Sequence, residues 1–141
     1  MQSNPYSKMR ENAIMTAPKE ELTLMLYDGA LKFINQAQAA ILAKDNNKAH
    51  ECLLRVQDII REFQITLDRS HEVSKHFDLM YDYIYRRLVD ANVAKDPEIV
   101  KECCELVRSM RDMWKEAMQA ARSAPQLKAG LAAGSGKSLQ G

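Results

Sequence analysis

The chain has 141 residues, of which 28% are charged and 46% hydrophobic, and 20 Lys and Arg against 19 Asp and Glu leave a formal net charge of +1. This length fits one domain, and the charge balance argues against nucleic acid and anionic membrane surfaces as partners. Three cysteines do not make a disulfide framework. We expect no signal peptide and no membrane insertion, because no apolar run approaches the ~18 residues of a membrane span. The composition thus predicts a cytoplasmic protein.

The distribution of glycine and of apolar residues favours an all-α fold. Gly29 is the only glycine before residue 130, which leaves little material for hairpin turns. Apolar residues recur at spacings of three and four over residues 18–121, which is the period of an amphipathic helix. The connections between the expected helices are short, so neighbouring helices should run antiparallel. The sequence therefore predicts an all-α, antiparallel up-down four-helix bundle over residues 16–122.

The first two helices have recognisable ends. The first is expected from about Pro18 to Leu42, because a proline fits the first turn and the acidic residues that follow suit the positive end of the helix dipole. Asp45 or Asn46 can cap the second helix, which should end near Asp68. Helices of about 20–27 residues would each be roughly 30–40 Å long.

The third helix is expected from about His71 to Asn92. Asp96-Pro97-Glu98 then combines an N-cap, a first-position proline and an acidic first turn, and so predicts a fourth helix that ends near Arg122. Two segments lie outside this bundle. Residues 1–15 form a short N-terminal capping segment with enough apolar side chains to dock elsewhere. Residues 123–141 contain no acidic residue and are typical of a flexible C-terminal tail.

Each helix carries more apolar residues than one core-facing stripe requires. The first helix has a principal stripe of Leu22, Met25, Leu26, Gly29, Phe33, Ala37, Ala40 and Ile41, and a second row of Leu24, Tyr27, Leu31 and Ile34 or Asn35. The surplus positions of the other helices are Leu54 and Ile65, then Leu79, Tyr83, Tyr85 and Val89, and finally Val100, Val107 and Met118. These rows either fill a wide core or form grooves for a partner helix.

No arrangement of polar residues predicts catalysis, a cofactor or a metal site. His71 and His76 lie about 140° apart around a helix, so they cannot share a metal ion as an i, i+4 pair does. The adjacent Cys103 and Cys104 are expected to pack as small hydrophobes. The basic pair at 86–87 in a neutral chain is more typical of a solvated or salt-bridged face than of a nucleic-acid site. We therefore expect a binding protein and not an enzyme.

Four segments of the sequence resemble the FliS family of bacterial flagellar secretion chaperones. They are TAPKEELTLMLYDGA at 16–30, the QDIIRE core of 49–68, LMYDYIYRRL at 79–88 and DMWKEA at 112–117. The resemblance extends over residues 4–120, and the four segments occur in the order and with the spacing of the family. Four segments in register make this resemblance specific.

The resemblance implies both a fold and a function. Members of the family are antiparallel four-helix bundles with a short N-terminal segment. They are cytoplasmic export chaperones that bind the disordered C-terminal region of flagellin, prevent its premature polymerisation and keep it competent for flagellar type III export. The family also docks on the export-gate protein FlhA, and some members bind the anti-sigma factor FlgM.

The resemblance also assigns partner-binding roles to particular residues. It implies a partner-facing part of the first helix with Leu24, Tyr27, Asp28 and Leu31, and a third-helix motif with Tyr83, Arg86 and Arg87. The two arginines have a second interpretation, in which they pair with acidic residues such as Asp28 or Asp82 and hold the helices in register.

The N-terminal segment carries a further part of the resemblance. In the family, a tyrosine precedes an Ala-hydrophobic-Met-Ser/Thr-Ala pattern, and this is matched here by Tyr6 and by AIMTA at 13–17. In relatives, this segment can cover an apolar groove of the free chaperone and contributes to the export-gate contact. We therefore predict that Tyr6, Ile14 and Met15 act as a displaceable lid.

Three other interpretations of the apolar rows stay open. A helical adaptor or co-chaperone would use the same grooves for another client. A small bundle enzyme or metal carrier would need ligand pairs that the sequence does not provide. A homodimeric structural bundle would bury the rows between two copies of the chain.

Overall fold

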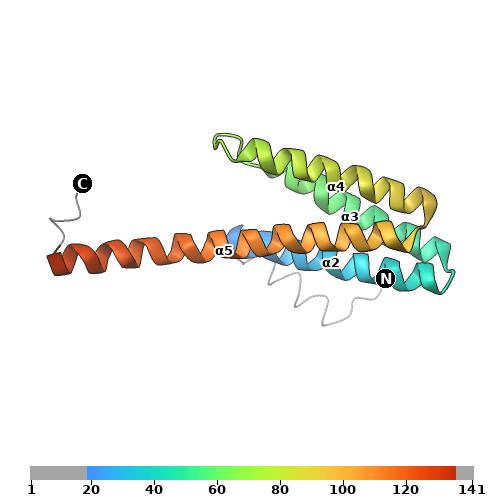
Figure 1. Ribbon diagram of the computed structural model, residues 1–141, viewed down its shortest axis with the longest axis horizontal. Coiled ribbons are helices and arrows are strands. Elements are labelled where there is room, and N and C mark those ends of the chain that lie inside the picture. The colour runs from blue at the N-terminus through green and yellow to red at the C-terminus, as the bar shows by residue number, and fades with distance from the viewer. Residues whose placement is uncertain (1–18, 136–141) are drawn as a thin grey trace, which may run out of the picture.

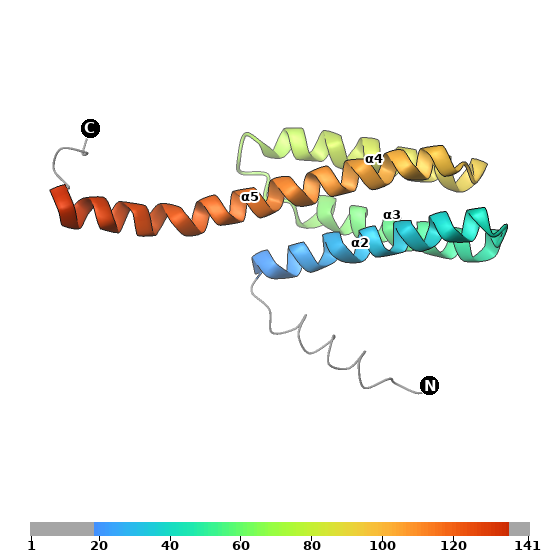
Figure 2. The same cartoon turned by 60° about the horizontal axis from the view of Figure 1, so that its bottom comes forward.

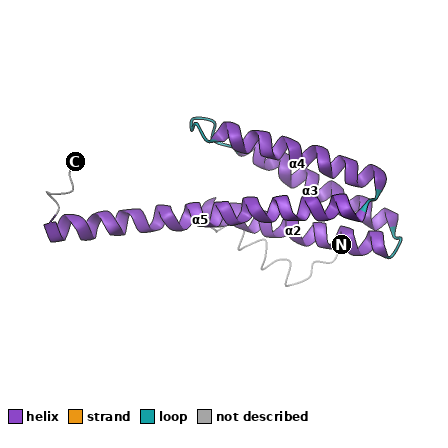
Figure 3. Ribbon diagram, viewed as in Figure 1, coloured by secondary structure: helices purple, strands orange, loops and turns teal. Residues whose placement is uncertain are grey.

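The structure is a computed structural model that describes the backbone of residues 19–135 and the side chains of residues 19–120. Its four helices are α2 (Lys19–Leu42), α3 (Asn46–Thr66), α4 (Ser74–Ala94) and α5 (Pro97–Ser135). Among the described residues there are only helices and the short loops that join them (Figure 3). The predicted all-α fold is confirmed. The predicted capping segment, residues 1–15, lies outside the described residues.

The helices form an up-down-up-down bundle. Both α2 and α4 pack against α3 and α5, and consecutive helices run in opposite directions (Figure 1). The C-terminal part of α5 continues past the ends of the other three helices (Figure 2). The predicted antiparallel arrangement is therefore confirmed as well.

Local hydrogen bonds explain where two of the helices begin. Asp45 is the N-cap of α3, and its side chain accepts a hydrogen bond of 3.2 Å from the backbone N–H of Lys48. Asp96 accepts one of 2.9 Å from the N–H of Glu98, directly before the helix that starts at Pro97. Of the two predicted caps for the second helix, Asp45 is therefore the one used.

Two predicted boundaries differ from the structure. The helix α4 begins at Ser74 and not at His71, because Asp68 accepts hydrogen bonds from the backbone N–H and the hydroxyl of Ser70, at 3.0 and 2.7 Å, and so holds the chain in a turn. The helix α5 continues to Ser135, whereas the sequence predicted its end near Arg122. The described helix thus includes residues 123–135 of the predicted tail, although Pro125, Gly130 and Gly134 are unfavourable in a helix interior. The flexibility of this tail stays a prediction. Residues 136–141 lie outside the described residues.

Both apolar rows of α2 contribute to the core, the principal stripe through Ala37 and Ala40 and the second row more completely. Tyr27, Leu31 and Ile34 of the second row are buried, whereas Leu22, Met25 and other residues of the principal stripe are only half-buried. On α5, the surplus residues Val100, Val107 and Met118 are likewise buried. The core also contains Leu53, Val56 and Ile60 of α3, and Ile84, Leu88 and Ala91 of α4. The surplus rows of α2 and α5 thus belong to a wide core.

A tyrosine pair joins α2 to α4 across the middle of the bundle. The hydroxyls of Tyr27 and Tyr81 form a hydrogen bond of 2.6 Å, and both side chains are buried. The ring of Phe63 lies 4.4 Å from that of Tyr27 and 5.5 Å from that of Tyr81, measured between centroids. Burial raises the pKa of both tyrosines above the ordinary value, so the pair is neutral at physiological pH.

Two neighbouring leucines on α3 test this assignment of core and surface. Leu53 is fully buried, so Leu53→Ala should lower the free energy of unfolding by about 2–5 kcal/mol through lost apolar contact and a residual cavity. Leu54 is 41% exposed, so Leu54→Ala should change it by less than about 1 kcal/mol. Urea unfolding followed by circular dichroism measures both. Equal losses for the two variants would contradict the assigned orientation of α3.

Candidate partner-binding site

A cavity of about 460 Å³ lies at the end of the bundle where α2 and α4 begin. Its walls come from all four helices and from the α3–α4 loop: Lys19, Glu20, Thr23, Phe63, Thr66, Leu67, Asp68, His71, Val73, Ser74, Phe77, Tyr81 and Trp114. The aromatic and aliphatic members make the cavity mainly apolar, which is typical of a site that accepts apolar side chains. We call it the end cavity.

The sizes of the buried side chains explain why this end is open. The bundle end opposite the end cavity contains buried alanines from three helices, namely Ala37, Ala40, Ala49 and Ala91. Small side chains let helices approach closely, whereas the aromatic rings at the other end hold them apart. Figure 1 shows the result, because the α3–α4 pair diverges from the α2–α5 pair toward the start of α4.

Trp114 connects the two helices on one side of the end cavity. Its indole Nε1 donates a hydrogen bond of 3.1 Å to the backbone oxygen of Glu20, in the first turn of α2. The ring is half-buried, packs against the core and lines the end cavity. Trp114 is the only tryptophan of the chain, so its fluorescence reports on this site alone.

Apolar side chains also lie exposed on the outer faces of α3 and α4. The large ones are Leu54 and Ile65 on α3, and Leu79, Tyr83, Val89 and Val93 on α4. Ile65 and Leu79 are 76% and 71% exposed. The surplus rows predicted on the second and third helices therefore lie at the surface, except for Tyr85, which is half-buried and packs against the core. These exposed apolar side chains are available for contact with a partner.

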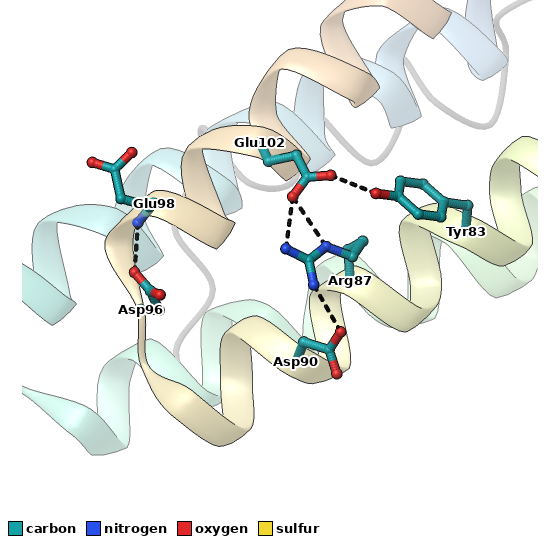
Figure 4. Close-up of polar contacts among 6 residues, drawn as sticks. All are labelled: Tyr83, Arg87, Asp90, Asp96, Glu98 and Glu102. Atoms are coloured by element: carbon teal, nitrogen blue, oxygen red, sulfur yellow. Dashed lines mark hydrogen bonds and ion pairs between the residues drawn. The ribbon is translucent and has the colours of Figure 1, made fainter.

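A polar cluster links α4 to α5 (Figure 4). Arg87 donates two hydrogen bonds, of 3.0 Å from Nε and 2.8 Å from Nη2, to Oε1 of Glu102. The Tyr83 hydroxyl donates one of 2.7 Å to the other oxygen of Glu102, and Arg87 also pairs with Asp90 at 2.9 Å. The hydrogen bonds from Tyr83 and then from Arg87 hold the pKa of the Glu102 carboxyl below its ordinary value, whereas the carboxylate raises the pKa of Tyr83.

The structure corrects two of the residues predicted on the first helix. Tyr27 is 1% exposed and Leu31 is 7% exposed, so neither lies on a partner-facing surface of this structure. They point inward because their row packs on the other helices together with Ala37 and Ala40 of the principal stripe. Leu24 is half-buried, and Asp28 is exposed with an ion pair of 3.4 Å to Arg111 of α5.

The third-helix motif is at the surface. Arg87 joins α4 to α5 through Glu102, as the interpretation of helix register predicted, although its acidic partner is neither Asp28 nor Asp82. Arg86 pairs with Asp82 at 3.2 Å on its own helix and does not link helices. The predicted lid residues Tyr6, Ile14 and Met15 lie outside the described residues.

Sequence reasoning missed the residues of the end cavity. Phe63, Phe77, Tyr81 and Trp114 lie at the spacing of core-facing positions, and periodicity alone cannot tell a packed ring from one that lines a cavity. Their clustering at one end of the predicted helices, opposite the alanines, was the available signal. Within residues 19–120, no three His, Cys, Asp or Glu side chains come close enough to hold a metal ion, and none of the described helices is long and apolar enough to cross a membrane.

The polar cluster predicts a pH dependence of stability. A carboxyl whose pKa is lowered on folding stabilises the fold above its unfolded pKa, and that contribution is lost as the pH falls through the folded value. The ordinary pKa of this carboxyl is 4.5, so Glu102→Gln should make the decline of the urea unfolding midpoint below pH 4.5 less steep. The exposed Glu105 lies one turn away, and Glu105→Gln serves as the control with the wild-type slope. Parallel profiles for all three proteins would show that Glu102 makes no such contribution.

Comparison with known proteins identifies the family. A family profile described as flagellar protein FliS matches residues 2–121. The chain is 45% identical over 119 residues to the flagellar secretion chaperone FliS of Bacillus subtilis, which covers 84% of this chain and 90% of that protein. It is 32% identical over 113 residues to the FliS chaperone of Escherichia coli K12, which covers 77% of this chain and 82% of that protein. The chain therefore belongs to the FliS family of flagellar secretion chaperones.

Proposed function

We propose that the protein is a cytoplasmic export chaperone that binds the disordered C-terminal region of flagellin. Binding covers the region through which flagellin polymerises, and so prevents premature filament assembly and keeps the subunit competent for type III export. The end cavity is the observation that supports this proposal most directly. It offers four aromatic side chains, Phe63, Phe77, Tyr81 and Trp114, where apolar side chains of a client can insert.

The distribution of apolar surface suits a disordered client. A segment that folds on binding loses conformational entropy, and this loss costs several kcal/mol. The end cavity and the exposed apolar side chains of α3 and α4 lie on different parts of the bundle, so a long client segment can bury area on more than one face. That distributed burial offsets the ordering cost better than one small pocket would.

The proposal includes two further partners and leaves two alternatives. The export-gate protein FlhA and the anti-sigma factor FlgM are proposed partners on the ground of family membership. A different client, or a second copy of this chain, would use the same apolar surface. Titration with the flagellin peptide, together with the oligomeric state of the free protein, distinguishes these cases.

A calorimetric titration against a peptide from the flagellin C-terminus tests the main proposal. We expect roughly one-to-one binding with a large negative heat-capacity change, and a shift of Trp114 emission, because apolar surface is buried at the end cavity. Phe77→Ala should weaken binding by about five- to thirtyfold, since it truncates a ring in the wall of the cavity.

Leu42→Ala is the matched control for this titration. Leu42 is 69% exposed at the end of α2 away from the end cavity, so its truncation should leave the affinity unchanged. Circular dichroism confirms that each variant is folded. Absence of binding by the folded wild-type protein would refute the flagellin proposal, and equal losses for both variants would show that the cavity is not the site.

A second prediction concerns the proposed lid of Tyr6, Ile14 and Met15. The N-terminal segment joins the bundle at Lys19, which itself lines the end cavity, so this segment is attached at the site that it would cover. Deletion of residues 1–15 should raise the affinity for the flagellin peptide, because a competitor is removed. The same calorimetric titration measures it. Unchanged or lower affinity would mean that the segment is not a lid.

A further inference from the structure

The buried hydroxyls of Tyr27 and Tyr81 carry one hydrogen more than their mutual hydrogen bond uses. Burial raises the pKa of both tyrosines, so each hydroxyl keeps its hydrogen at physiological pH. One of the two hydrogens lies in the bond of 2.6 Å between the oxygens. Among the described residues, no other group forms a hydrogen bond with either hydroxyl. One buried hydroxyl hydrogen is therefore left without an acceptor.

The positions of the two rings decide which hydroxyl carries this spare hydrogen. Tyr81 lies in the wall of the end cavity, whereas Tyr27 is 1% exposed and is not part of that wall. A donor that is buried without an acceptor destabilises a fold, and native structures rarely contain one. The favourable arrangement is therefore the one in which Tyr27 donates to the oxygen of Tyr81, and Tyr81 donates into the end cavity.

The other hydroxyl and indole donors in the wall of the end cavity already have acceptors. Each donates to a backbone oxygen of this chain, Thr23 to Lys19, Thr66 to Glu62, Ser74 to Asp68 and Trp114 to Glu20. His71 pairs with the carboxylate of Asp68 at 3.4 Å. Among the described residues, Tyr81 is thus the hydroxyl of this wall that can donate to a ligand without giving up a bond inside the chain.

The contacts of Tyr81 hold this donor in place. Its ring packs against those of Phe63 and Phe77, with centroids 5.5 and 6.3 Å away, and its hydroxyl is bound to Tyr27. The ring and its tip are therefore fixed before a client arrives. A donor that is fixed in advance loses little conformational freedom when it forms a hydrogen bond with a ligand.

We propose that the end cavity selects a client group that combines an apolar body with one neutral oxygen atom, and that the Tyr81 hydroxyl donates a hydrogen bond to this oxygen. The inference rests on the proposed function and names the chemistry that the end cavity recognises. Solvent can accept from Tyr81 in the free protein, whereas a client that fills the cavity displaces solvent and has to supply the acceptor itself. A pure hydrocarbon group would leave the donor unpaired and bind less well.

The apolar wall favours a neutral oxygen over a carboxylate. A carboxylate that enters an apolar cavity loses its hydration, and one hydrogen bond from Tyr81 does not replace it. The oxygen therefore belongs either to a backbone carbonyl of the client or to an uncharged hydroxyl or amide side chain.

Tyr81→Phe and Tyr27→Phe form a matched pair of variants, because each removes one hydroxyl and breaks the same hydrogen bond. Both should lower the thermal unfolding midpoint by about 2–8 °C and keep a helical circular dichroism spectrum. Calorimetric titration with the flagellin C-terminal peptide separates them. Tyr81→Phe should weaken binding by about five- to thirtyfold, since the client oxygen loses its donor, whereas Tyr27→Phe should change the affinity by less than about twofold.

Peptide variants locate the accepting oxygen. Each Ser, Thr, Asn and Gln of the peptide is replaced in turn by Ala, and each Tyr by Phe, and every variant is titrated against the wild-type protein and Tyr81→Phe. If the oxygen belongs to a side chain, one replacement weakens binding to the wild type and has no further effect on Tyr81→Phe. If no replacement does so while Tyr81→Phe still binds the parent peptide less well, the oxygen is a backbone carbonyl.

Equal affinities of Tyr81→Phe and Tyr27→Phe for the parent peptide would overturn the inference, because a purely structural role of their bond affects the two variants alike. If Phe77→Ala weakens binding while these two variants bind equally well, the proposed function stands and the role of the Tyr81 hydroxyl fails. If the folded wild-type protein does not bind the peptide, both fail.

Discussion

The bundle depends on a gradient in the size of its buried side chains. Alanines fill one end, where Ala37, Ala49 and Ala91 let the helices approach closely, and aromatic rings fill the other. Helices that are joined by short loops and pack closely at one end must diverge where larger rings separate them. The end cavity is the space that this divergence leaves, lined by Phe77 and Trp114, which the fold cannot bury completely. The site is thus a consequence of how the core is built and needs no separate loop or insertion.

Hydrogen bonds between distant parts of the chain keep the divergent end ordered. The indole of Trp114 donates to the first turn of α2, and the hydroxyls of Tyr27 and Tyr81 meet across the core. In each of these side chains the aromatic ring packs against apolar neighbours, and the hydroxyl or the indole N–H forms a hydrogen bond. Buried tyrosines and tryptophans usually find such a hydrogen-bond partner. Toward the closed end, Arg87 and Glu102 connect α4 to α5. The open end is therefore held by hydrogen bonds among three of its helices, and two of the residues that form these bonds, Tyr81 and Trp114, also line the end cavity.

Much of the fold could be predicted because its signals are local. A few neighbouring residues are enough to encode the helical spacing of apolar residues, the N-cap at Asp45 and the helix start at Pro97. The orientation of α2 could not be predicted, because the helix carries apolar residues on two faces. One face includes Leu22 and Phe33, and the other includes Tyr27 and Ile34. Only the positions of α3 and α5 decide how deeply each face is buried. For this reason Tyr27, which the sequence predicted on a partner-facing surface, is buried in this structure. The end cavity was missed since it depends on the angle between helices, which no segment of sequence encodes alone.

The division of apolar surplus among the helices follows from the same geometry. On α2 and α5 the surplus residues fill the core, whereas on α3 and α4 Leu54 and Leu79 remain exposed. Exposed apolar side chains lower solubility, so a protein that keeps them uses them for binding or pairs them with charge. On α4 they alternate with ion pairs such as Arg86 and Asp82, which keep that face solvated in the free protein. In the proposed function, a client would displace water from the apolar parts while Arg86 and Asp82 stay paired within α4. In the proposed function, binding and solubility would therefore depend on different side chains of the same face.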